Sequence, residues 1–158
     1  MPFIIEFGAT AKRLFGLNSL DYNTWDAAWK LILIVAGADG EVSQKERDVI
    51  IDLARTTGGT DELIDILENF DFKNARLEDY LLNVDQKTRH ILLYCALLAA
   101  RADGLLESER NKAYEMAEIM NIEPVMSEAI EQLLDLEDQV NSLRHILFLK
   151  PDNLLNRN

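Results

Sequence analysis

The chain has 158 residues, 48% of them hydrophobic, which suits one domain with a core of its own. Its formal net charge of −12 at pH 7 argues against nucleic acid and anionic membranes as partners. Seven glycines and three prolines are few for a β-sandwich, and the single cysteine excludes an intramolecular disulfide. We therefore expect an all-α, single-domain helical bundle of about seven to nine helices.

Residues 1–22 are predicted to form an amphipathic helix, over residues 1–17, and a connector. Six apolar residues recur at helical spacing and would share one face: Phe3, Ile4, Phe7, Ala11, Leu14 and Phe15. We expect this face to pack on the rest of the domain. The alternative is a helix lying in a membrane interface, for which two basic residues, Lys12 and Arg13, are few.

Residues 23–138 contain an internal duplication. Ala38-Asp39-Gly40 recurs 64 residues later as Ala102-Asp103-Gly104. Each copy follows an apolar run that is too long for a typical strand and too short to cross a bilayer, so both runs are predicted as buried central helices. Glycine after a helix readily takes the left-handed conformation, so each motif is predicted as a tight turn between two helices. The two repeat units span about residues 25–70 and 78–138.

Capping residues predict where the helices begin. Ser43 and Glu46 have the S-x-x-E spacing of a capping box, at the start of the helix after the first turn. The second copy lacks one residue, so the offset becomes 63 and Glu46 aligns with Glu109. Ser108 is the predicted cap in that copy.

Caps are also predicted for the two central helices. Asn23 or Thr24 would cap the first of them, and Asp85 the second, over about residues 86–101.

The last part of the chain is predicted as two helices and a tail. Pro124 would open the first, which buries Leu133, Leu134 and Leu136. Residues 139–158 would form a short helix from Val140 to Leu149 that folds back on the domain, ended by Pro151, and then a tail.

The two acidic turns are a candidate site for a divalent cation. An EF-hand loop is excluded, because its positions 1 and 3 would be Val35 and Gly37, which bring no side-chain oxygen. Carboxylates of both copies could converge instead if the two units pack about a pseudo-two-fold axis. The predicted ligands are Asp39, Glu46, Asp103 and Glu109, with Glu41 and Glu107 as alternates. Such oxygen ligands suit Ca²⁺, Mg²⁺ or Mn²⁺, and the alternative is that these residues only cap helix ends.

Two segments together carry a family resemblance. One is the apolar helix leading into Ala38-Asp39-Gly40-Glu41-Val42-Ser43 with Glu46, and the other leads into Ala102-Asp103-Gly104 with Glu107 and Glu109. Over about residues 25–138 this pattern resembles the TerB family of tellurite-resistance proteins, and it is similar to the N-terminal domain of DjlA-type membrane co-chaperones. The resemblance implies an all-helical fold without an established catalytic activity, a cation held by acidic residues, and a role in tellurite resistance or stress response.

These observations predict a non-enzymatic acidic module in the cytoplasm. No basic n-region with a cleavage site is present, so we expect no secretory leader. The sequence also has no transmembrane run, no G-x-S-x-G elbow and no phosphate-binding loop. The expected partners are a basic protein surface or other stress-response proteins, which an acidic surface attracts. The alternatives are an interaction or scaffolding domain that holds no metal, and a metal-assisted hydrolase that uses the same carboxylates.

Overall fold

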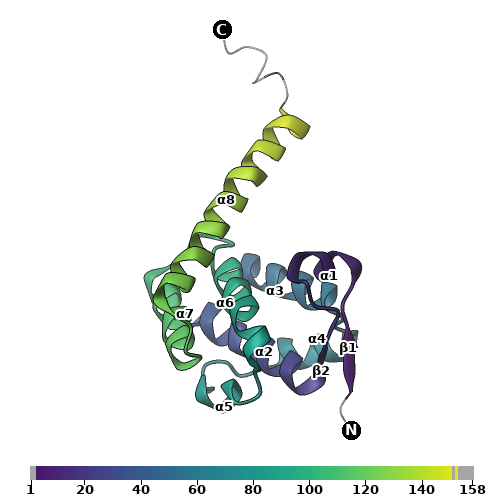
Figure 1. Ribbon diagram of the computed structural model, residues 1–158, viewed down its shortest axis with the longest axis vertical. Helices are drawn as coiled ribbons and strands as arrows, with labels where there is room; N and C mark the ends of the chain where they lie inside the picture. Colours follow the sequence, from purple (N-terminus) through teal and green to yellow (C-terminus); the bar gives the residue numbers. More distant parts are fainter. Residues whose placement is uncertain (1–2, 151, 153–158) are drawn as a thin grey trace.

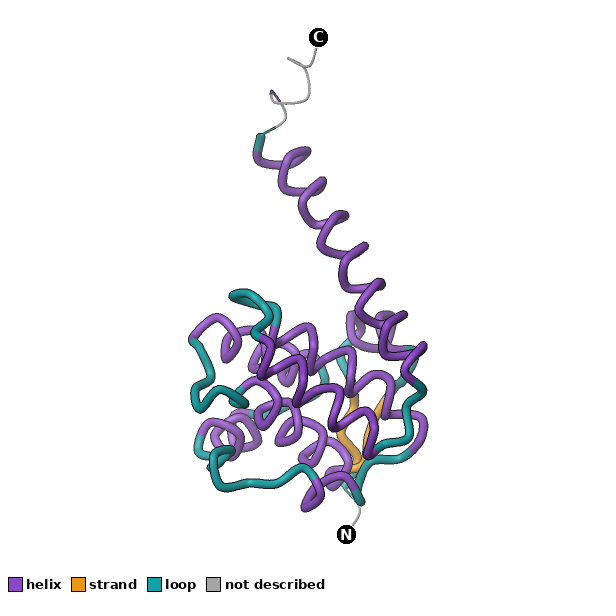
Figure 2. Tube along the Cα trace, turned by 90° about the vertical axis from the view of Figure 1, so that its left-hand side faces the viewer, coloured by secondary structure: helices purple, strands orange, loops and turns teal. Residues whose placement is uncertain are grey.

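The computed structural model describes residues 3–150 and residue 152, which form eight helices and two short strands. A helical body contains most of the chain, and the end of the last helix projects from it (Figures 1 and 2). The predicted all-α bundle is confirmed, with one small two-stranded sheet added to it. Within the described residues, no helix combines the length and the apolar character needed to cross a membrane.

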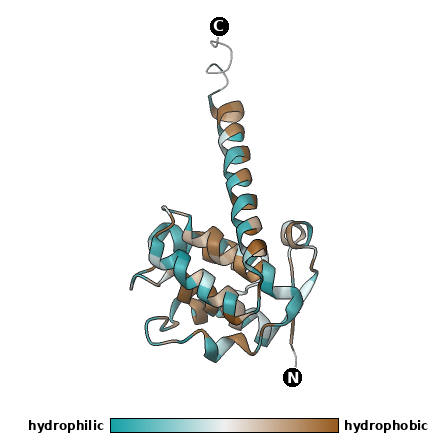
Figure 3. Ribbon diagram, turned by 60° about the vertical axis from the view of Figure 1, so that its left-hand side comes forward, coloured by the Kyte–Doolittle hydropathy of each residue, from teal (hydrophilic) through white to brown (hydrophobic). Residues whose placement is uncertain are grey.

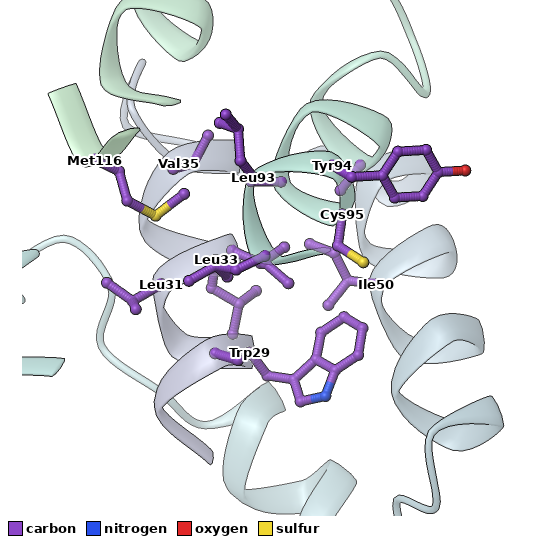
Figure 4. Packing of buried hydrophobic residues seen from close by; sticks show 14 of the residues in the cluster. Trp29, Leu31, Leu33, Val35, Ile50, Leu93, Tyr94, Cys95 and Met116 are labelled. Carbon is purple, nitrogen blue, oxygen red and sulfur yellow. The ribbon is translucent and has the colours of Figure 1, made fainter. Parts of the chain in front are cut away.

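Two apolar helices form the centre of the body. α2 (Tyr22–Ala36) and α6 (Gln86–Ala100) pack against each other and are buried over most of their length. They are the two runs that precede the Asp-Gly turns. Figure 4 shows their side chains meeting those of the neighbouring helices: Leu31, Leu33 and Val35 of α2, Leu93 and Cys95 of α6, Ile50 and Met116.

The helix that follows each turn packs on both central helices. α3 (Gln44–Thr56) contacts α2 and α6, and α7 (Glu107–Ile119) contacts α6 and α2. α4 (Asp61–Glu68) is the last helix of the first repeat unit, and α5 (Glu78–Leu81) begins the second unit and packs on α2. The two units are therefore interleaved, because each one packs its second helix against the first helix of the other.

The N-terminal segment differs from the predicted helix. β1 (Ile4–Glu6) pairs antiparallel with β2 (Ser19–Asp21), with Ile5 opposite Leu20, and α1 is confined to Ala9–Phe15. Alternation along the strand buries Ile5 and leaves Ile4 and Glu6 exposed. Outside the strand, Phe7 is buried and Phe3 is exposed. A Cβ at Gly8 would lie 2.9 Å from the carbonyl oxygen of Thr56, so the chain comes too close to α3 there for a larger residue.

The observed starts of the helices contradict two of the predicted caps and confirm two others. Asp21, rather than Asn23 or Thr24, caps α2, and its carboxylate accepts the Thr24 N–H at 3.0 Å. Asp85 caps α6 as predicted, accepting the Thr88 N–H at 2.9 Å. Ser43 caps α3 within a complete capping box. In the second copy Ser108 lies inside α7, and the N-cap position is Leu106.

α8 (Pro124–Leu149) is one unbroken helix, so the prediction of a second short helix folded back on the domain was wrong. Pro124 occupies its first turn as expected, and Leu134 is buried, but Leu133 and Leu136 are exposed. No glycine or proline interrupts residues 125–149, so nothing in the sequence ends the helix at residue 139. The predicted stop at Pro151 lies outside the described residues.

Candidate functional site

The two Asp-Gly turns have the predicted left-handed glycines. Gly40 and Gly104 have φ angles of 100° and 109°, a conformation that residues with a side chain rarely adopt. Asp39 uses one carboxylate oxygen to accept the Glu41 N–H at 3.0 Å, and it is exposed to solvent, as Asp103 is. Each turn therefore presents an aspartate at the surface, just before the start of α3 or α7.

Glu46 and Glu109 are the buried members of the predicted set, each 2% exposed. Each is the third residue of its helix and accepts the N–H of the N-cap residue, at 2.7 Å from Ser43 and 3.0 Å from Leu106. The Ser43 hydroxyl returns a bond by accepting the Glu46 N–H, whereas Leu106 has no side-chain oxygen to do so. These backbone bonds aim both carboxyl groups back toward the turns.

The interleaved helices bring the two glutamates together. Their carboxyl groups lie close enough for each to affect the pKa of the other, so two acids from opposite repeats share one buried position. Burial raises the pKa of Glu109 to about 7, and the negative charges of Glu46 and Asp39 act in the same direction. Burial also raises the pKa of Glu46, with a further contribution from the charge of Asp103. Each aspartate thus acts on the glutamate of the other copy.

One oxygen of this pair has no donor unless a proton is present. Oε1 of Glu46 is buried and finds no N–H or O–H partner among the described residues. A protonated Glu109 supplies that donor, because two carboxylates can hydrogen-bond only by sharing a proton. The pair therefore holds one proton near neutral pH and loses it as the pH rises.

The four predicted ligands differ in how strongly they interact. Glu46 and Glu109 each affect the pKa of the other, and Asp39 and Asp103 are near enough for their charges to act on the pair. The alternates Glu41 and Glu107 are exposed to solvent. In the part of the chain that the structure describes, no group of three or more His, Cys, Asp or Glu side chains is arranged to hold a metal ion. A bound cation would thus require the two exposed aspartates to turn inward.

The sequence indicated that the two glutamates could converge, but it did not predict their burial, and it misplaced the N-cap of α7. A signal for that cap was present, because the offset of 63 that aligns Glu46 with Glu109 also aligns Ser43 with Leu106. The single cysteine, Cys95, is buried, and burial raises the pKa of its thiol to about 12, so it is not an activated nucleophile.

The chain is similar to the solved structure of a tellurite resistance protein from Nostoc punctiforme. The two are 27% identical, the match covers 89% of each chain, and the TM-score is 0.76. No family model and no curated protein matches the chain. The likeness in both fold and sequence extends well beyond the two turns, to nearly the whole of the described chain.

Proposed function

The chain is TerB-like, and on that premise we propose that it is a non-enzymatic acidic module of tellurite resistance that binds a divalent cation between its two Asp-Gly turns. The observation that carries the proposal is the Glu46–Glu109 pair, with a buried oxygen that has no donor of its own. A cation in place of the shared proton would satisfy that oxygen.

The donor set determines the class of ion. Carboxylate oxygens are hard ligands, which Ca²⁺, Mg²⁺ and Mn²⁺ prefer over nitrogen or sulfur. Two oxygens of the pair are already committed to backbone N–H groups of Ser43 and Leu106, so few are free. Because Asp39 and Asp103 must also move, we expect weak binding, with a Kd on the order of a millimolar.

The net charge of −12 favours a role in handling cations or basic proteins rather than tellurite itself. Tellurite is an oxyanion, and a surface with this charge repels it. We therefore place the module beside the chemistry of tellurite detoxification, as a binding platform for basic or stress-response proteins, and not at the reacting ion.

Calorimetric titration of the full chain with Ca²⁺, Mg²⁺ and Mn²⁺ tests the cation site. Binding requires the pair to lose its proton, so affinity should rise with pH up to about 7 and then level off. One displaced proton corresponds to about a tenfold loss of affinity for each pH unit below that value. The double variant Asp39→Asn plus Asp103→Asn should remove the heat of binding, while Asp48→Asn on the exposed face of α3 should not.

Three results would contradict the proposal. An absence of binding heat at pH 8 with all three ions would leave the turns as structural elements of an interaction domain. Cation binding that survives the double aspartate variant would place the site elsewhere. Metal-dependent turnover of a phosphoester or peptide panel would indicate the hydrolase alternative.

A further inference from the structure

The projecting part of α8 carries an apolar stripe that the body leaves open. The stripe consists of Leu133, Leu136, Val140, Leu143 and Leu147, each between 46% and 58% exposed. Their separations alternate between three and four residues, the spacing of a coiled-coil seam. Figure 3 shows apolar residues recurring on successive turns of this part of the helix.

The stripe is distinct from the face by which α8 is attached to the body. That face buries Ile130 and Leu134, and it lies roughly a third of a turn away at 3.6 residues per turn. Arg101, the C-cap residue of α6, extends the attachment by bonding Asp135 at 2.8 Å and Asp138 at 3.4 Å. Among the described residues, no hydrogen bond or ion pair joins α8 to the body beyond Asp138, so another helix has access to the stripe.

The apolar surface continues from the stripe onto the body. Leu14 of α1, itself 50% exposed, and Tyr94 of α6 line a hollow of about 480 Å³ together with the stripe residues Leu133 and Leu136. This hollow lies where the end of a helix running back along α8 would arrive.

We propose that a second copy of this chain occupies the stripe, with the two α8 helices antiparallel. In the register that aligns the two stripes, Val140 packs against Leu143 of the other copy and Leu136 packs against Leu147. The two-fold symmetry repeats each of these pairs. The two bodies then lie at opposite ends of the helix pair. A parallel pair would place both bodies side by side at the same end.

Charge complementarity favours the same orientation. Glu137 and Arg144 both stand one residue after a seam position and flank it on one side. In an antiparallel pair such residues face each other, so Glu137 of each copy meets Arg144 of the other. In a parallel pair their counterparts would be Gln132 and Gln139, which carry no charge. The antiparallel pair therefore gains two intermolecular ion pairs, and the parallel pair gains none.

Five apolar residues per chain make a short seam compared with a standard interface of ~1,600 Å². We therefore expect a dimer in the micromolar range or weaker, visible when the chain concentration is varied. Sedimentation equilibrium of the full chain from low micromolar to millimolar concentration should show the mass rise from one copy to two. Leu143→Asp should weaken the dimer at least tenfold, while Phe148→Asp, one position past the seam and 74% exposed, should not.

A charge exchange tests the orientation. Glu137→Lys and Arg144→Glu should each weaken the dimer, and the double variant should restore it, because each exchanged residue again meets its opposite charge. Tyr94 donates to Glu137 at 2.7 Å, so helicity and melting temperature are recorded for every variant. A chain that stays monomeric throughout, or a double variant that does not recover, would overturn the proposal. So would a monomer that uses the stripe to bind anionic phospholipid vesicles, with binding lost in Leu143→Asp.

Discussion

Glu46 and Glu109 place two acidic groups in a position that is almost closed to water. Their bonds to the backbone follow from the capping positions, and the spacing of the repeat correctly paired them as equivalent residues. Their burial was not predictable from that spacing, because a glutamate in the first turn of a helix is commonly at the surface. It follows from the packing of α3 and α7 on the same two central helices, which depends on contacts between distant segments.

The first prediction is a loss of stability as the pH rises toward neutrality. The pKa of Glu109 is raised from its usual 4.5 to about 7 by burial, so the folded state holds a proton that the unfolded state has lost. The stabilising effect of that proton is complete below pH 4.5 and disappears as the pH passes through 7. The difference is on the order of 2–3 kcal/mol in the free energy of unfolding. Urea titrations without added cations, at intervals from pH 4.5 to 8, measure it.

Replacing Glu109 by glutamine isolates this contribution. The amide is neutral at every pH and can still accept the Leu106 N–H, so Glu109→Gln should match the parent near pH 4.5 and exceed it by about 2 kcal/mol at pH 8. Glu107→Gln is the matched control, because Glu107 is exposed on the same helix. A parent chain with a flat profile between pH 4.5 and 8 would show that the two acids do not share a proton.

At the scale of helices and strands, two caps were misplaced by local preference although the repeat spacing points to the observed positions. The offset of 64 from Asp85 gives Asp21, the observed cap of α2, where the local sequence favoured Asn23 or Thr24. The N-terminal helix was overpredicted because its 3.6-residue periodicity competes with pairing to residues 19–21, a partner that local periodicity does not register.

The incomplete cap of α7 makes a second testable case. Leu106 is 47% exposed and has the extended backbone of an N-cap, and its N–H already bonds Glu109. Leu106→Ser would add the missing hydroxyl and complete the capping box, as Ser43 does on α3. We expect a gain of about 1 kcal/mol in the free energy of unfolding, measured in urea. The reverse change, Ser43→Leu, should cost about as much, and a neutral or destabilising Leu106→Ser would contradict the assignment.

The whole molecule is organised by the way its two halves interlock. α2 and α6 share the centre, α3 packs on α6, and α7 packs on α2. The sequence indicated a duplication and two buried runs, since long apolar segments and repeated turns are local features. It did not specify which second helix crosses to which first helix, because both arrangements bury the same apolar faces.

Interleaving predicts that neither half folds without the other. We would divide the chain between Lys73 and Asn74, two exposed residues between α4 and α5, which keeps Phe72 with its contact at Gly37. Fragments 1–73 and 74–158 should each show little helical circular dichroism, because α2 and α6 would expose faces that are buried in the intact chain. Mixing them at equal concentration should restore the helical signal and a cooperative thermal transition. A first fragment that melts cooperatively by itself would mean that the repeats are side-by-side units, in which case the Glu46–Glu109 contact would be incidental to the fold.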